Sequence, residues 1–97
     1  MADWIPLAAH PHGATIAAFT ARSFLGRAEP GRLAVAYAAR GEGEGARLRV
    51  EATFGALAEG PPGYAHGGSV AAVLDEALGV AAWLAHRPAV AARLEVD

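Results

Sequence analysis

The stretch from about Gly68 to Ala85 constrains the fold of this 97-residue chain more than any other segment. Its large apolar residues and some of its alanines recur at helical spacing and define one apolar face, centred near Ala77 and Ala81 at roughly 100° per residue. The residues of this face are Val70, Val73, Leu74, Ala77, Leu78, Ala81 and Leu84. Pro88 prevents the helix from continuing. We therefore predict one long helix whose apolar face packs against other elements.

The same stretch is apolar enough to raise the question of a membrane span. Asp75 and Glu76 lie at its centre, and it is shorter than the roughly 20 residues that a bilayer requires. We therefore expect no membrane span. The N-terminal residues combine no basic region with a long apolar run, so we predict no secretory signal and expect a cytoplasmic protein.

Two alternating segments precede the helix. From Arg32, every second residue suits the buried face of a strand, and a second strand follows with one wet and one buried face. The first strand buries Leu33, Val35, Tyr37 and Ala39; the second exposes Arg47, Arg49, Glu51 and Thr53 and buries Leu48, Val50, Ala52 and Phe54. Residues 41–45, Gly-Glu-Gly-Glu-Gly, form a flexible acidic turn between them. The pattern predicts a β-hairpin.

The remaining segments are less regular. Residues 1–31 are interrupted by prolines and glycines, and residues 14–25 suit either a short helix or an irregular strand. The sequence Gly60-Pro61-Pro62-Gly63 marks residues 55–66 as a loop rather than a central strand. After the helix, Val90, Ala92, Leu94 and Val96 alternate with smaller or polar residues, which predicts a third strand.

The order of strand, strand, long helix and strand predicts a single α+β domain over residues 1–97. A sheet able to cover the helix usually has more strands, so we expect a fold truncated at its C-terminus, or one completed by a partner chain.

The net charge of −2 gives no reason to expect nucleic-acid binding. The absence of cysteine excludes disulfides, thiol nucleophiles and thiolate metal sites.

The segment His66-Gly67-Gly68 lies where the stiff loop meets the helix. The first N–H groups of a helix have no partner within the helix, and the helix dipole adds positive charge there. Glycines allow a substrate carbonyl to approach these groups, so the segment can form an oxyanion hole from backbone alone. The alternative is that the glycines only permit a tight turn, which His66 caps.

Asp75 lies opposite the predicted apolar face, in a stripe of small residues. The stripe contains Gly68, Ala72, Gly79 and Ala82. A carboxylate in such a stripe faces a close-packed surface or a narrow ligand channel. The alternative is that Asp75 and Glu76 form a solvent-exposed acidic pair.

Gly67 and Asp75 are eight residues apart, which is about 12 Å along a helix axis. One substrate carbonyl does not reach both groups of a single chain. Two antiparallel helices related by a twofold axis would bring Gly67 of one subunit to Asp75 of the other, twice. We therefore predict a homodimer with two shared sites.

The run from Gly60 to Ala77, GPPGYAHGGSVAAVLDEA, resembles the hotdog thioesterase superfamily. It is most similar to the phenylacetate-degradation type and to the thioesterase-superfamily-member branch. That family has a His-Gly-Gly motif followed by an acidic residue nine positions after the histidine, as His66 and Asp75 are here. The resemblance covers roughly residues 30–97. It implies a hotdog fold, in which an antiparallel sheet wraps a long central helix.

The resemblance also implies an activity, the hydrolysis of an acyl-CoA thioester to a free acid and CoA. Asp75 would be the general base or the nucleophile, the Gly67 N–H would stabilise the oxyanion, and His66 would orient the thioester or hold the loop. Gly68, Glu76 and Tyr64 would contact the substrate. No cofactor and no metal ion is implied. The expected assembly is a homodimer or a dimer of dimers.

The chain departs from the family pattern at several positions. Gly60 stands where some relatives have asparagine. Ala91 and Ala92 stand where many have the serine or threonine that helps to place water, and the family's N-terminal cysteine motif and its last strands are missing. These departures favour an alternative in which the domain binds acyl groups or CoA, or serves as an interaction module, without hydrolysis.

Three other classes of site have little support. An α/β-hydrolase needs a Gly-x-Ser-x-Gly elbow and a longer chain. A metal site would have to use His10 and His12, which are neighbours, with His66 and His86 far along the chain. A phosphate-binding loop at residues 41–45 is opposed by its two glutamates.

Overall fold

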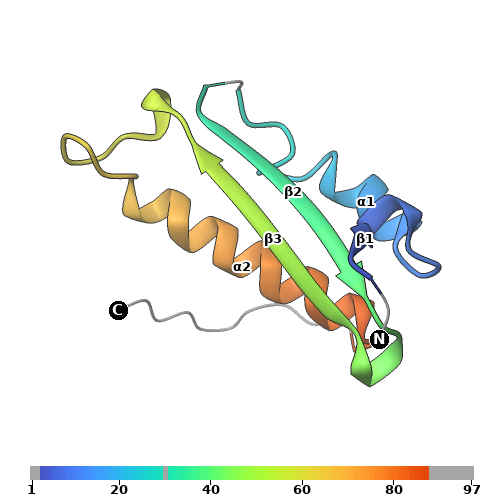
Figure 1. Ribbon diagram of the computed structural model, residues 1–97. Coiled ribbons are helices and arrows are strands. Elements are labelled where there is room, and N and C mark those ends of the chain that lie inside the picture. Colours follow the sequence, from blue (N-terminus) through green and yellow to red (C-terminus); the bar gives the residue numbers. More distant parts are fainter. Residues whose placement is uncertain (1–2, 30, 88–97) are drawn as a thin grey trace.

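The computed structural model describes residues 3–29 and 31–87, which form an α+β fold with a three-stranded antiparallel sheet in the order β1-β2-β3 (Figure 1). The strands are β1 (Ile5–Pro6), β2 (Leu33–Arg40) and β3 (Arg47–Phe54). The helices are α1 (Ala14–Thr20) and α2 (Gly67–Leu84), with 3₁₀ turns η1 (Leu7–Ala9), η2 (Gly43–Gly45) and η3 (Ala56–Ala58).

The predicted β-hairpin is confirmed. Strands β2 and β3 pair along their whole length, from Leu33 opposite Phe54 to Arg40 opposite Arg47. Exposure alternates along β3 as predicted, with residues 47, 49, 51 and 53 exposed and residues 48, 50, 52 and 54 half-buried. The acidic turn contains η2, and its Gly41 and Gly43 adopt positive φ values of 75° and 56°, which favour glycine.

The N-terminal third resolves the choice left open by its sequence. Residues 14–20 form a helix, α1, and not a strand. Strand β1, which the pattern did not predict, pairs Ile5 with Ala39 and Pro6 with Ala38 at the edge of β2. A two-residue strand gives no detectable alternation, so sequence reasoning misses it.

The predicted long helix is confirmed to within one residue at each end. Figure 1 shows α2 lying lengthwise along the β2–β3 hairpin. The chain leaves the helix through His86, whose φ of 63° places it in the left-handed region. The Arg87 N–H then donates to the Ala82 carbonyl at 2.7 Å, an arrangement that closes helix ends.

The predicted apolar face of α2 is confirmed in part: Leu84 is buried and Val70, Val73, Ala77 and Ala81 are half-buried, but Leu74 and Leu78 are exposed. The helix buries Val80 and Leu84 against the sheet, with Trp83 half-buried beside them, whereas Leu74 and Leu78 are 42% and 61% exposed. The buried stripe is therefore turned away from the predicted centre at Ala77 and Ala81. Because α2 carries apolar residues on every side, its sequence specifies the buried side only weakly.

The core joins four elements of the described fold. Leu7 of η1, Ile16 of α1, Ala39 of β2, and Val80 and Leu84 of α2 form one buried cluster. The third strand predicted over residues 90–96 lies outside the described residues.

Replacing Leu84 by alanine tests this core. Leu84 is 1% exposed, so the substitution leaves a cavity and should lower the free energy of unfolding by about 3 kcal/mol. Leu57→Ala, at a leucine that is 59% exposed, is the control and should change it by less than about 1 kcal/mol. Urea unfolding monitored by circular dichroism measures both. Equal losses in the two variants would contradict the placement of α2.

Candidate functional site

The N-terminus of α2 is formed by the His-Gly-Gly segment. His66 is the N-cap residue, and its Nδ1 accepts a hydrogen bond from the Gly68 N–H at 3.0 Å. The Ser69 and Val70 N–H groups donate to the His66 carbonyl. Within residues 3–29 and 31–87, no group accepts from the Gly67 N–H, and Gly67 is exposed.

The structure shows the capping, and the oxyanion hole stays a prediction. His66 does cap the helix, as the simpler alternative holds. The cap satisfies the Gly68 N–H, and among the described residues the Gly67 N–H has no acceptor. Because Nδ1 accepts the bond from Gly68, a neutral His66 ring carries its proton on Nε2.

The loop before α2 is held by its own hydrogen bonds. The His66 N–H donates to the Ala58 carbonyl at 2.7 Å, and the Gly60 N–H donates to the Tyr64 carbonyl at 2.8 Å. The Gly63 N–H donates to the Glu59 carboxylate at 2.9 Å, and Gly63 has a φ of 82°. These bonds fix where α2 begins and how the Gly67 N–H is presented.

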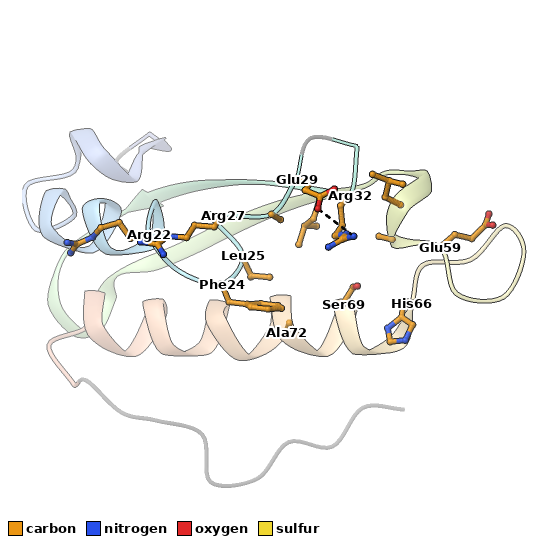
Figure 2. Close-up of a pocket in the computed structure, with 14 residues that line it drawn as sticks. Arg22, Phe24, Leu25, Arg27, Glu29, Arg32, Glu59, His66, Ser69 and Ala72 are labelled. Carbon is orange, nitrogen blue, oxygen red and sulfur yellow. Dashed lines mark ion pairs between the residues drawn. The ribbon is translucent and has the colours of Figure 1, made fainter.

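A cavity of about 660 Å³ lies beside the first two turns of α2. Its walls are the first turns of α2, the loop between α1 and β2, the start of β2 and the turn η3 (Figure 2). The lining residues are Arg22, Phe24, Leu25, Arg27, Ala28, Glu29, Arg32, Leu33, Leu57, Ala58, Glu59, His66, Ser69 and Ala72. A cavity of this size accommodates a small-molecule ligand or an acyl group.

Asp75 does not line this cavity. It is exposed, and the intervening segment is one continuous helix, so the axial separation of about 12 Å from Gly67 applies. Leu74 and Leu78, which are also exposed, flank it. Asp75 is therefore presented on the outward side of α2, and one chain does not bring it to its own helix N-terminus.

Glu76 has a different environment from Asp75. It is half-buried on the sheet-facing side of α2 and accepts a hydrogen bond from the Tyr37 hydroxyl of β2. Burial raises the pKa of Tyr37 above its ordinary value, and the hydrogen bond to Glu76 and the negative charge of Glu76 raise it further. The alternative of an exposed acidic pair therefore describes Asp75 and not Glu76.

The other residues expected to contact substrate are dispersed. Gly68 is exposed at the helix start and donates to His66. Tyr64 is 72% exposed and lines a separate hollow with Phe54 and Ala56. Glu76 is bound to Tyr37 and does not line the large cavity. The fold thus brings His66, Gly67 and Gly68 together and leaves Asp75, Glu76 and Tyr64 apart from them.

Sequence reasoning missed the opposite wall of the cavity. Arg22, Phe24, Leu25 and Arg27 belong to a segment whose pattern could not be interpreted. Ser69 lies on α2 directly after the motif and lines the cavity. One feature of the sequence indicates that Ser69 could line a site: Ser69 is a polar residue in the first turn of the helix, next to the stiff loop.

The fold brings together histidines that lie far apart in the sequence. His86 lies against His12, with ring centroids 5.2 Å apart, and His12 lies 5.9 Å from His10. Both ring nitrogens of His10 are already used, by the Gly41 carbonyl and the His12 N–H. In the part of the chain that the structure describes, no group of three or more His, Cys, Asp or Glu residues is arranged to hold a metal ion.

By length and composition alone, α2 could cross a membrane. Helices of soluble proteins and signal sequences pass the same test, so this finding decides nothing by itself.

Comparison of the chain with models of protein families, with curated proteins and with solved structures finds no match.

The Tyr37–Glu76 pair predicts a pH dependence of stability. The pKa of Tyr37 is raised on folding above its ordinary value of 10.0, so its contribution is complete below about pH 10 and is lost as the pH rises further. The sequence has no lysine, so few other groups titrate in this range. Urea unfolding between pH 8 and pH 11 should show a steeper loss of stability for the wild type than for Tyr37→Phe. Parallel curves would contradict the pairing.

Proposed function

We propose that this chain is a hotdog-type acyl-CoA thioesterase that hydrolyses a thioester to a free acid and CoA. One observation carries the proposal. The free Gly67 N–H stands at the N-terminus of a long helix, beside a cavity of about 660 Å³, in the motif that resembles this superfamily. The α+β arrangement, with α2 lying along an antiparallel sheet, supports the hotdog fold.

The proposed oxyanion donor is the Gly67 N–H. It carries the partial positive charge of the helix N-terminus, and a thioester carbonyl that bonds to it gains stabilisation as negative charge develops on the oxygen. His66 orients this end of the helix through its bond to Gly68, and its Nε2–H is available to the substrate.

The proposed catalytic carboxylate is Asp75 of a second subunit. As a general base it takes a proton from water, whose oxygen attacks the thioester carbonyl, and the CoA thiolate leaves. As a nucleophile it attacks the carbonyl itself and expels the CoA thiolate, and water then hydrolyses the mixed anhydride that forms. The exposed leucines at positions 74 and 78 flank Asp75 on the side of α2 where the second subunit would lie.

Acyl or CoA binding without hydrolysis is the second candidate. The observation in its favour is the position of Asp75 outside the cavity lining of its own chain. A binding module needs the cavity and no carboxylate. Thiol release from a panel of acyl-CoAs distinguishes the two functions.

The Asp75→Asn substitution tests the carboxylate. It should lower the rate of thiol release by a hundredfold or more, roughly, without changing the melting temperature, because Asp75 is exposed. Glu42→Gln, at another exposed carboxylate, is the control and should leave the rate unchanged. A rate for Asp75→Asn equal to that of the wild type would remove Asp75 from the mechanism.

A pair of substitutions at Gly67 tests the oxyanion donor. Gly67→Pro removes only the N–H. Proline is tolerated at the first residue of a helix, and His66, with φ −61° and ψ 129°, already has the conformation that precedes proline. Gly67→Ala keeps the N–H, and nothing lies within 4 Å of the added Cβ.

We expect Gly67→Pro to lower kcat by about 10²–10³-fold and Gly67→Ala to retain most of it. Steady-state thiol release measures both, and circular dichroism checks that each variant is folded. Equal rates for the two variants would show that the Gly67 N–H takes no part in the reaction.

A further inference from the structure

Two of the three arginines that line the large cavity, Arg22 and Arg27, differ from the other arginines in the described part of the fold. Each of the others in the described part has a partner. Three form ion pairs: Arg32 with Glu29, Arg49 with Glu51 and Arg87 with Glu44. Arg40 lies over the Trp4 ring, and Arg47 donates to the Ala46 carbonyl. Arg22 and Arg27 have no ion-pair or hydrogen-bond partner for their guanidinium groups within residues 3–29 and 31–87. Both line the cavity.

The two arginines stand at the end of the cavity away from the start of α2. Figure 2 shows Arg22 and Arg27 at one end of the lining residues and His66, Ser69 and Glu59 toward the other. Between them lie the buried Leu25, Phe24, which reaches from the loop toward Ala72, and the ion pair of Glu29 and Arg32. The cavity therefore has Arg22 and Arg27 at one end and the start of α2 at the other, with apolar side chains and one ion pair between them.

The segment that carries the arginines is fixed by internal bonds. The Ser23 hydroxyl donates to the Thr20 carbonyl at 2.8 Å and accepts from the Gly26 N–H at 3.1 Å, and the Arg27 N–H donates to the Ser23 carbonyl at 3.1 Å. A Cβ at Gly26 would collide with the Thr20 carbonyl oxygen, so only glycine allows the chain to fold back so closely. The backbone that carries both arginines is thus fixed before a ligand binds, which lowers the cost of binding.

The charge of the lining favours an anion. Its three arginines outnumber its two glutamates, and Glu29 and Glu59 are held by Arg32 and by the Gly63 N–H. A guanidinium group binds a phosphate or a carboxylate through two parallel hydrogen bonds.

We infer that Arg22 and Arg27 bind an anionic group of the substrate at the far end of this cavity. The inference rests on the proposed function for the identity of the substrate. The anion is either a phosphate of CoA or a carboxylate at the end of the acyl group. A neutral acyl-pantetheine would leave both arginines without a partner.

The test compares the double variant Arg22→Gln/Arg27→Gln with the wild type and with Arg47→Gln, an exposed arginine outside the cavity. Titration calorimetry first measures the binding of CoA and of pantetheine, which lacks the nucleotide phosphates. It then measures glutaryl-pantetheine and pentanoyl-pantetheine, which match in length and differ in the terminal carboxylate. The Asp75→Asn background prevents turnover of these two thioesters.

We expect the double variant to bind one anionic probe about tenfold or more weakly, while its neutral counterpart binds unchanged. A loss for CoA identifies a phosphate, and a loss for glutaryl-pantetheine identifies a carboxylate. The loss should shrink as the ionic strength rises. An unchanged melting temperature shows that the variant is folded.

Two results would overturn the inference: equal affinities of the double variant and Arg47→Gln for both anionic probes, or no binding of either probe by the wild type. Thiol release, measured in parallel with Asp75 intact, separates this inference from the proposed function. Hydrolysis that does not depend on the arginines contradicts the inference about the arginines and leaves the proposed thioesterase function standing. Binding that depends on the arginines, without hydrolysis, supports the inference and contradicts the thioesterase.

Discussion

The packing of α2 against the β2–β3 hairpin determines where every group of the candidate site lies. Val80 and Leu84 anchor one half of the helix in the core, and farther toward its start the contact is polar, between Tyr37 and Glu76. A half-buried hydroxyl without a partner costs about 1–3 kcal/mol, so this bond restricts the rotation of the helix about its axis. If α2 were turned so that Leu74 and Leu78 faced the sheet, Glu76 would lose Tyr37.

The rotation fixed in this way gives α2 two sides with different surroundings. Ser69 and Ala72 face the cavity, and Asp75 faces outward beside the exposed Leu74 and Leu78. The N-terminus of α2 lies beside the cavity. The separation of Asp75 from that end, about 12 Å along the axis, is a property of any straight helix, so a second chain is the simplest source of the carboxylate.

Much of the fold could be predicted because the spacing of apolar residues along the chain depends on which side chains each strand or helix buries. The alternation over residues 33–40 and 47–54 predicted both strands, and the helical spacing after Gly67 predicted α2 nearly to the residue. The buried side of α2 was predicted only in part, because a helix rich in alanine has apolar residues all around and two of its three leucines lie on the exposed side. The bond between Tyr37 and Glu76 joins residues 39 positions apart, and no local pattern contains that information. The cavity wall at residues 22–29 was missed for the same reason, since its glycine and serine matter only through the contacts they make with α1.

Subunit complementation tests the central claim, that each site combines Gly67 of one chain with Asp75 of another. The single variants Asp75→Asn and Gly67→Pro each lack one of the two groups, so neither should hydrolyse thioesters alone. When they are mixed and allowed to exchange subunits, half of the dimers are mixed, and each mixed dimer contains one intact site. The account predicts recovery of about a quarter of the wild-type rate of thiol release. A mixture that stays as inactive as its components, although exchange is complete, would contradict the shared site.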